Sequence, residues 1–200
     1  MKKILGYIKR AQNEFHMIKQ GDVVAVGLSG GKDSMTLLYA LHLFQHFSPV
    51  SYTLKAITLD LGFPGFDSAA ISQYCQTLGV ELLLEKTQIS SVVFQQRKES
   101  NPCSLCARMR RGRLNKICDS NGITKLALGH HGDDLVESLL MSMLFEGRMS
   151  SFQPVTRYER ASVIMIRPMI FAPELEVSQA ARRHNIPRVG NPCPADGHTK

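Results

Sequence analysis

Residues 23–34 read Val-Val-Ala-Val-Gly-Leu-Ser-Gly-Gly-Lys-Asp-Ser, an apolar run followed by a short loop with two glycines. The apolar run predicts a buried strand, and the pattern that begins at Asp33 predicts a helix. Adjacent glycines let the backbone turn sharply, and the amide groups at the start of a helix attract anions. Lys32 adds a positive charge, and Ser29 and Ser34 add hydroxyl groups. This stretch therefore predicts a phosphate-binding loop between a strand and a helix.

The loop differs from the P-loop of nucleoside triphosphatases, in which Ser or Thr directly follows the Gly-Lys pair. Asp33 follows Lys32 here, and the loop resembles instead the PP-loop of the N-type ATP pyrophosphatases. That resemblance implies that ATP is cleaved between its α and β phosphates to give AMP and pyrophosphate. The ATP-binding residues that it implies are Ser29, Gly30, Gly31, Lys32, Asp33 and Ser34.

Apolar runs and helical patterns alternate along the rest of the chain. Strands are predicted over residues 23–28, 53–59, 80–84, 125–128 and 163–166. Helices are predicted over residues 2–19, 33–47, 67–78, 89–97, 104–120, 133–145 and 173–183, and residues 185–200 are predicted to be irregular. Such alternation is typical of an α/β, Rossmann-like fold with a parallel sheet of about five strands and helices on both faces. We expect one domain, because 200 residues suit a single hydrophobic core.

Three polar motifs directly follow predicted strands, at residues 29–34, 60–62 and 129–134. In open α/β sheets, ligands bind beyond the carboxyl ends of the strands. The three motifs are therefore expected to meet at one edge of the sheet. From this topology we expect the adenine of ATP to lie against the backbone near Leu59 and Gly129.

The composition is that of a globular protein, with 44% hydrophobic and 20% charged residues. No stretch approaches the roughly 20 apolar residues that span a bilayer, and no continuous apolar run follows the first three residues as in a secretory signal. Five cysteines with only one close pair do not suggest a disulfide framework. We therefore expect a cytoplasmic protein with no membrane partner.

The net charge of +7 lies mainly in the second half, where residues 101–200 carry 14 Lys or Arg against 9 Asp or Glu. One predicted helix holds five basic residues with no acidic residue between them: Arg108, Arg110, Arg111, Arg113 and Lys116. A solvated helix face is one explanation. Contact with RNA phosphates is the other, and the position of the helix beside two cysteines favours it.

Cys103 and Cys106 stand three residues apart at the start of that predicted helix, so they project from the same face. A helix start also favours thiolate over thiol. Structural zinc, a redox dithiol, an iron–sulfur cluster and two cysteines without chemistry all remain alternatives. Cys193, between two prolines, is the natural third ligand, whereas Cys75 and Cys118 fall within apolar helical patterns and are interpreted as buried thiols.

Taken in order, the motifs resemble the TtcA/TtuA family of PP-loop tRNA thiolases, and among them the tRNA 2-thiocytidine synthetases. The resemblance implies an ATP-dependent tRNA sulfurtransferase that adenylates a pyrimidine C2 oxygen and replaces it with sulfur. It also implies Mg²⁺ and a [4Fe-4S] cluster on Cys103, Cys106 and Cys193. The partners to test are tRNA, a sulfur donor (a cysteine desulfurase or free sulfide) and a second copy of the chain in a homodimer. The motifs that carry the resemblance are residues 15–18, 21–22, 29–34, 102–106, 108–112, 129–134, 166–168 and 192–193.

Four residues are predicted to act on the reacting groups: Lys32, Asp33, Arg110 and Asp134. Lys32 would hold the departing pyrophosphate, and Arg110, one turn after Cys106, would contact the α-phosphate or the activated base. The resemblance places Asp134 near the α-phosphate. Asp33 either holds Mg²⁺ or caps its helix, and at least one of Asp133 and Asp134 is expected to be a helix cap.

Two other functions stay open at this point. A PP-loop ligase of the tRNA lysidine synthetase kind would adenylate the same oxygen but add an amine, which leaves the three cysteines without a role. A non-catalytic nucleotide or iron–sulfur sensor would use the cluster as a signal. His130 and His131 are interpreted as loop-shaping residues, with metal binding or proton transfer as the alternative.

Overall fold

The centre of the fold is a mixed six-stranded sheet in the order β3-β2-β1-β4-β6-β5. The structure is a computed structural model that describes residues 1–97, 102–158, 161–190 and 192–195. The strands are β1 (Val23–Leu28), β2 (Thr53–Asp60), β3 (Glu81–Lys86), β4 (Lys125–Ala127), β5 (Val155–Arg157) and β6 (Ile164–Ile166). The α-helices are α1 (Lys2–Phe15), α2 (Lys32–Phe44), α3 (Ser68–Thr77), α4 (Pro102–Ser120), α5 (Gly132–Met141) and α6 (Glu174–Arg183), with π-helical segments η1 (Ser91–Arg97) and η2 (Ser142–Glu146).

The predicted α/β fold with a parallel sheet is confirmed for five of the strands, but the strand count was too low. Strands β1, β2, β3, β4 and β6 are all parallel to one another, and β5 pairs antiparallel with β6. β5 was not predicted, because it has three residues, Val-Thr-Arg, and lies at the edge of the sheet, where no buried apolar run is required.

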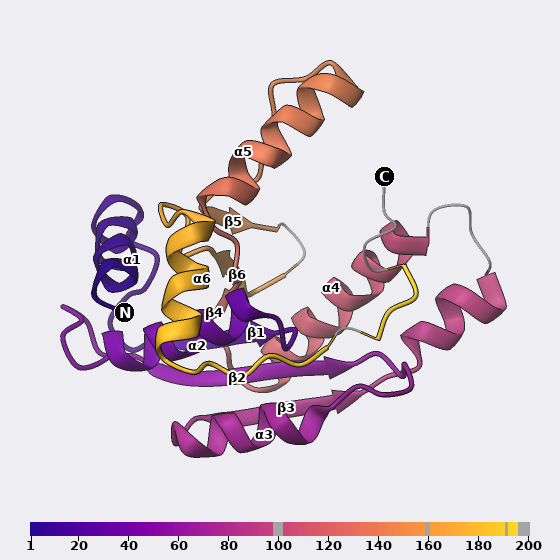
Figure 1. The fold of residues 1–200 in the computed structure, drawn as a ribbon, viewed down its shortest axis with the longest axis horizontal. Helices are drawn as coiled ribbons and strands as arrows, with labels where there is room; N and C mark the ends of the chain where they lie inside the picture. Colours follow the sequence, from indigo (N-terminus) through magenta and orange to yellow (C-terminus); the bar gives the residue numbers. More distant parts are fainter. Residues whose placement is uncertain (98–101, 159–160, 191, 196–200) are drawn as a thin grey trace.

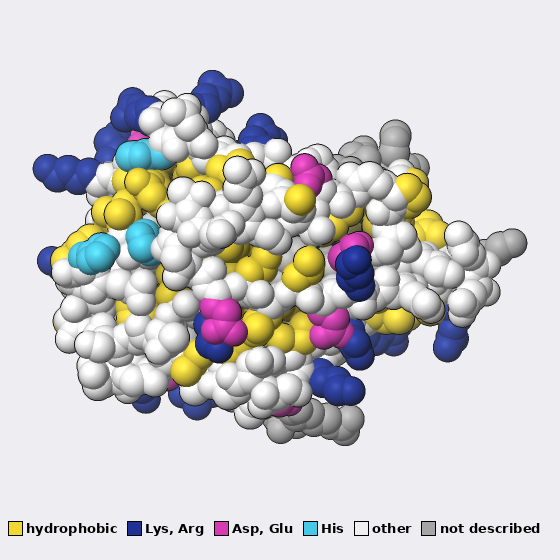
Figure 2. All heavy atoms as spheres, turned by 90° about the horizontal axis from the view of Figure 1, so that it is seen from below, with side chains coloured by type: hydrophobic (Ala, Val, Ile, Leu, Met, Phe, Trp, Pro, Cys, Tyr) yellow, Lys and Arg dark blue, Asp and Glu magenta, His cyan; other side chains and the backbone are white. Residues whose placement is uncertain are grey.

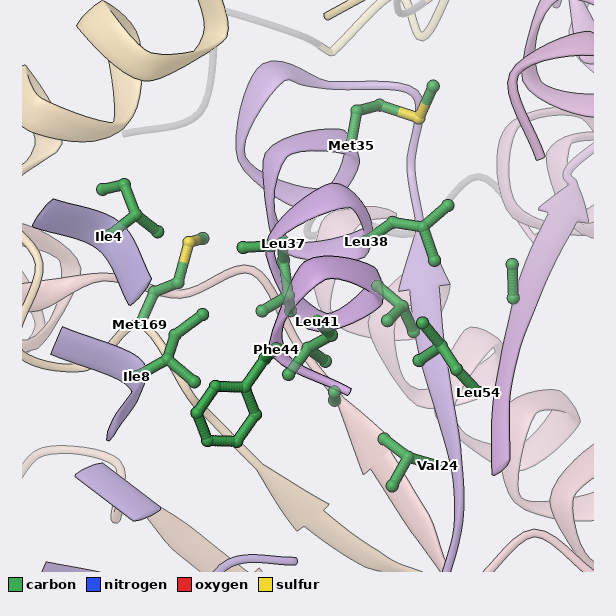
Figure 3. Close-up of a cluster of buried hydrophobic side chains, with 14 of the residues drawn as sticks. Ile4, Ile8, Val24, Met35, Leu37, Leu38, Leu41, Phe44, Leu54 and Met169 are labelled. Carbon is green, nitrogen blue, oxygen red and sulfur yellow. The ribbon is translucent and has the colours of Figure 1, made fainter. Parts of the chain in front are cut away.

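Helices cover both faces of the sheet, as the alternating pattern predicts (Figure 1). On one face, α1, α2, α3 and α6 pack with the sheet around a core that contains Leu38, Phe44 and Ile71. Figure 3 shows how side chains of α1 and α2 meet residues of β1 and β2 in this core. On the other face, Ile117 and Cys118 of α4 pack with residues of β1, β2, β4 and β6. β1 is central and buried on both sides, which explains its continuous apolar run.

Several predicted element ends were wrong by a few residues. The first helix stops at Phe15 instead of residue 19, because His16 adopts a left-handed conformation with φ 46° and its N–H bonds back to Gln12. The second helix stops at Phe44 instead of residue 47. The predicted helix 133–145 is divided into α5 and η2, and the predicted helix 89–97 is mostly the π-helical η1. The described residues after Asn185 lie in no helix or strand, as predicted, while residues 191 and 196–200 fall outside the described ranges.

None of the helices in the described ranges combines the length and the apolar composition needed to cross a bilayer.

Phe44 offers a test of the core. Phe44→Ala is expected to lower the free energy of unfolding by about 3–5 kcal/mol, because its side chain is fully buried and a cavity would remain. Phe47→Ala, three residues away in edge-to-face contact with Phe44 but half exposed, is the control and should cost less than about 1.5 kcal/mol. Urea unfolding measures both, and equal losses would contradict this account of the core.

Candidate active site

The loop between β1 and α2 lies where the strand order reverses. β1 pairs with β2 on one side and with β4 on the other, and both pairings are parallel. The loops that follow β1 and β4 therefore lie at the same edge of the sheet, the one formed by the carboxyl ends of the strands. Open α/β sheets bind ligands in the crevice at this switch point. Gly129, two residues after the end of β4, approaches the first turn of α2 so closely that a Cβ atom there would lie 2.8 Å from the Ser34 nitrogen. The two loops are therefore packed against each other with no room for a side chain.

Two serines shape the loop from within. The Ser29 N–H donates to Ser34 Oγ at 3.2 Å, and Ser34 Oγ donates to the Gly31 carbonyl at 3.1 Å. Ser34 is buried and does not line the cavity described below, so its role here is to hold the loop. Gly31 precedes α2 with no side-chain cap, which leaves the first amides of this helix available to an anion.

A cavity of about 720 Å³ opens beside this loop, a size suited to a nucleotide. Four residues that the sequence analysis singled out line it: Ser29, Gly31, Leu59 and Arg110. Gly30, Lys32, Asp33, Ser34, Gly129, Asp134 and the three cysteines are not among its lining residues. The sequence analysis missed Phe63 and Phe66, which follow β2, and Arg188 and Val189, which follow α6. The sequence did contain a signal for Arg188, because it is a basic residue in the Pro- and Gly-rich segment that leads to Cys193.

The segment after α6 returns to the phosphate-binding loop and forms part of the cavity wall (Figure 1). The Val189 N–H donates to the Gly30 carbonyl at 2.9 Å. Gly30 has φ +83°, and a Cβ atom at this position would lie 2.8 Å from Cβ of Val189. Glycine is thus required at position 30 for two reasons, its backbone conformation and its contact with the returning segment.

Lys32 points toward α6 rather than into the cavity. Its Nζ lies 2.8 Å from Asp33 Oδ1 and 2.9 Å from Glu174 Oε1 at the start of α6. Burial acts to lower the pKa of Lys32, but the hydrogen bonds to Asp33 and Glu174 outweigh burial and raise that pKa. The capping alternative for Asp33 is wrong, because no side chain caps the start of α2 and the carboxylate binds Lys32. Sequence alone gave no signal for Glu174.

The two acidic residues after β4 both act on helix starts, so the expected cap is confirmed. Asp134 Oδ2 accepts a hydrogen bond from the His131 N–H at 2.7 Å, and His131 Nδ1 faces the Asp134 N–H at 3.4 Å. This reciprocal pair is a capping box on α5. Asp133 Oδ2 accepts from the Glu174 N–H at 2.6 Å and thereby caps α6.

The two histidines of this loop are packed among protein groups. His131 is buried and occupies the capping position just described. The ring of His130 packs at 5.0 Å from the ring of Phe152, and burial, followed by the nearby Arg167 guanidinium, lowers the pKa of His130. Both observations agree with the loop-shaping interpretation.

The three cysteines share one neighbourhood, which also contains Arg110, a residue that lines the cavity. Burial raises the pKa of Cys106, the Arg110 guanidinium opposes this, and the Cys193 and Cys103 thiols add to the rise. The expectation that the helix start favours thiolate is therefore wrong for Cys106. Cys75 and Cys118 are buried thiols, as expected, and burial raises the pKa of Cys75 to about 11.

The donor set of Cys103, Cys106 and Cys193 fits an iron–sulfur cluster by its chemistry, because thiolates are the ligands of such clusters. All three side chains are partly buried, and each of the other two thiols acts on the pKa of Cys106. Within the described ranges, no three His, Cys, Asp or Glu side chains already stand close enough together to hold a metal ion.

The basic residues of α4 are exposed along the helix that carries Cys103 and Cys106. Arg113 pairs with Glu85, and the Arg111 guanidinium lies 5.4 Å from the ring centre of Tyr158. The face seen in Figure 2 differs, because its charged side chains of both signs are scattered among uncharged ones. The exposed side of α4 is thus a concentrated cationic surface next to the cavity.

Comparison with known proteins agrees with this geometry. The family described as "PP-loop domain" matches residues 4–196. The tRNA-cytidine(32) 2-sulfurtransferase of Geobacter sulfurreducens is 40% identical over 197 residues, which cover 98% of this chain and 77% of that protein. The enzyme of the same name from Geobacter metallireducens is 38% identical over the same length, with the same coverage.

Solved structures give a similar result. The U34-tRNA thiolase NcsA from Methanococcus maripaludis, solved with its [4Fe-4S] cluster, superimposes with a TM-score of 0.81 and 27% identity, covering 96% of this chain and 66% of that chain. A phosphoadenylyl-sulfate reductase from Candida auris reaches a TM-score of 0.57 at 11% identity and shares the fold alone.

Gly129→Ala tests the close packing of the two loops. The added methyl group would collide with the backbone of α2 at Ser34, so we expect a loss of about 1–3 kcal/mol in the free energy of unfolding. Gly6→Ala in α1, where nothing lies within 4 Å of the new atom, should be neutral or stabilising by up to about 1 kcal/mol. Urea titrations of both variants decide, and an unchanged Gly129→Ala protein would refute the packing.

Proposed function

We propose, because this chain belongs to the PP-loop domain family, that it is an ATP-dependent tRNA sulfurtransferase. The observation that carries the proposal is the cavity beside the PP-loop, which is lined by Ser29, Gly31 and Arg110, with Cys106 near Arg110. A nucleotide and a sulfur-bearing group would thus meet in one space. The names of the similar enzymes favour cytidine 32 of tRNA as the substrate base.

The reaction begins with activation of the base, because an oxide ion is a poor leaving group. The C2 oxygen of the pyrimidine attacks the α-phosphorus of ATP, and the bond to the bridging oxygen breaks to release pyrophosphate. The uncapped amides at the start of α2 would hold the departing phosphates, where their dipoles oppose the growing negative charge. A sulfur nucleophile then attacks C2, and AMP leaves with the original oxygen.

Arg110 is the residue that we place at the reacting groups, since it lines the cavity and acts on the pKa of Cys106. Lys32 would turn from Glu174 toward the phosphates. Asp134 acts on this site through His131 and the α5 cap, and Asp33 would hold Lys32 or Mg²⁺. Leu59 lines the cavity on the side expected for adenine, and Gly129 allows the close approach of the loops.

Cys103, Cys106 and Cys193 would hold a [4Fe-4S] cluster. Such a cluster would supply one iron with an open position, where an exchangeable sulfide can bind. The sulfide would come from a cysteine desulfurase or from free sulfide. The exposed arginines of α4 would bind tRNA phosphates. A cytoplasmic location is part of this proposal, because tRNA is its substrate.

Product analysis with a cysteine variant tests this function. Anaerobically purified protein is expected to be brown with about four iron atoms per chain, and to form thiolated nucleoside from ATP, Mg²⁺, sulfide and bulk tRNA. Cys193→Ser should lose both the iron and the product, whereas Cys118→Ala, which removes a fully buried thiol of the other core, should keep both. Iron analysis and nucleoside mass spectrometry are the readouts. A colourless zinc protein, an amine adduct, or no modified nucleoside would each overturn the proposal.

Glu174→Gln tests whether Lys32 must leave α6 to reach the phosphates. The variant removes a carboxylate 2.9 Å from Lys32 Nζ, so ATP should bind about 2- to 5-fold more tightly, the range set by a partly exposed ion pair. Glu176→Gln on the same helix, which breaks a pair with Lys3 instead, is the control and should leave ATP affinity unchanged. Isothermal titration calorimetry gives both values, and weaker ATP binding by Glu174→Gln would show that Glu174 supports the site.

A further inference from the structure

The cavity beside the PP-loop carries charge of one sign. Arg110 and Arg188 are its charged lining residues, and no acidic side chain of the described ranges lines it. The rest of the lining consists of apolar side chains, glycines and one serine. Two cations without a neutralising carboxylate favour an anionic ligand, and the apolar surroundings strengthen the attraction because they lower the local dielectric constant. The proposed function gives Arg110 a role at the reacting groups but leaves Arg188 without one.

The guanidinium of Arg188 is available to an anion. The residue is exposed, and it forms no hydrogen bond or ion pair with any residue in the part of the chain that the structure describes. Lys32 differs, because the carboxylates of Asp33 and Glu174 already hold its ammonium group. A phosphate that meets Arg188 therefore has no ion pair to break. The planar fork of N–H donors on arginine also matches two oxygens of one phosphate group.

The backbone is held in place on both sides of Arg188. Ile186 is buried in the main core, and Pro187 restricts the rotation of its own backbone. The Val189 N–H donates to the Gly30 carbonyl at 2.9 Å. The side chain of Arg188 therefore starts from a fixed position beside the PP-loop, and binding a ligand there costs side-chain freedom but little backbone freedom.

The position of Arg188 suits the phosphates of a nucleotide better than its base. The residue that follows Arg188 contacts Gly30, in the loop whose amides are available to an anion. The lining residues that suit a base come from elsewhere, since Leu59 lies near the end of β2 and Leu61 and Phe63 follow that strand. Aliphatic and aromatic side chains pack against the faces of a base, whereas a guanidinium pairs with phosphate oxygens.

We propose, on the basis of the proposed function, that Arg188 is a phosphate-binding residue of the nucleotide site. The start of α2 would hold the same phosphate chain through its backbone amides. Two segments that lie far apart in the sequence would thus grip one ligand. Cys193 follows Arg188 on the same segment, so a bound nucleotide would also hold in place the part of the chain that carries the third cysteine.

Isothermal titration calorimetry of the full chain, purified anaerobically, tests this role with two ligands, ATP with Mg²⁺ and adenosine. Arg188→Gln is expected to weaken ATP binding by at least about 10-fold, the effect of losing a hydrogen bond to a charged group. Adenosine binding should stay unchanged, because adenosine has no phosphate. Arg188→Lys, which keeps the charge but loses the planar fork, should bind ATP with intermediate affinity. Arg182→Gln removes the same charge from an exposed position of α6 that does not line the cavity, so this control should bind ATP normally.

The outcomes distinguish a failure of this role from a failure of the proposed function. Equal ATP affinities for Arg188→Gln and Arg182→Gln would overturn the role of Arg188. An equal loss of ATP and adenosine binding by Arg188→Gln would also overturn it, because Arg188 would then shape the cavity instead of binding phosphate. In both cases the unaltered chain still binds ATP, and the proposed sulfur transfer is untouched. An unaltered chain that binds no ATP would overturn both. Circular dichroism should be the same for all variants, since the altered side chains are exposed.

Discussion

The hydrogen bond from the Val189 N–H to the Gly30 carbonyl is the contact on which the arrangement of the site depends. It fixes the segment after α6 on the phosphate-binding loop, and Cys193 follows four residues later. Four residues span at most about 14 Å, so the contact confines Cys193 to the surroundings of the loop. Arg188 and Pro192, on either side of the contact, line the same cavity. One backbone contact thus ties the nucleotide site to the cysteine that lies farthest along the chain from the other two.

The electrostatics of the site follow from three helices that begin side by side. α2, α5 and α6 each present a positive helix end, and protein carboxylates neutralise two of them, Asp134 on α5 and Asp133 on α6. The start of α2 has no such partner, because Asp33 turns to Lys32 instead. An anion that enters this region therefore finds one helix start that is still available, and that start is in the PP-loop. The carboxylates of Asp33 and Glu174 hold the Lys32 ammonium group beside α6. Under the proposed function, a phosphate would have to compete with them for Lys32.

The sequence predicted the parts of this site that depend on local pattern, and missed those that depend on contacts across the chain. The β1–α2 loop, Leu59 and Arg110 were found because a strand end or a helical spacing places them. Glu174 was missed because its pairing with Lys32 requires α6 to pack beside α2, which no local pattern reveals. The thiolate prediction for Cys106 failed for a similar reason: a helix start lowers the pKa of a thiol, but tertiary burial raises it by more. β5 was missed because an edge strand of three residues needs no apolar run.

Arg110 connects the two halves of the site. Its guanidinium lines the cavity, and it opposes the effect of burial on the pKa of Cys106. Arginine keeps its charge at every relevant pH, so the electrostatic support that Arg110 gives to a Cys106 thiolate does not depend on pH. Only a movement of the Arg110 side chain, or its pairing with an anion, can change that support. A phosphate that pairs with Arg110 would reduce the support for a Cys106 thiolate. Thiolates that are already bound to a metal do not need this support, since the metal itself keeps them deprotonated. Arg110 is thus the side chain through which the nucleotide cavity and the cysteine cluster influence each other.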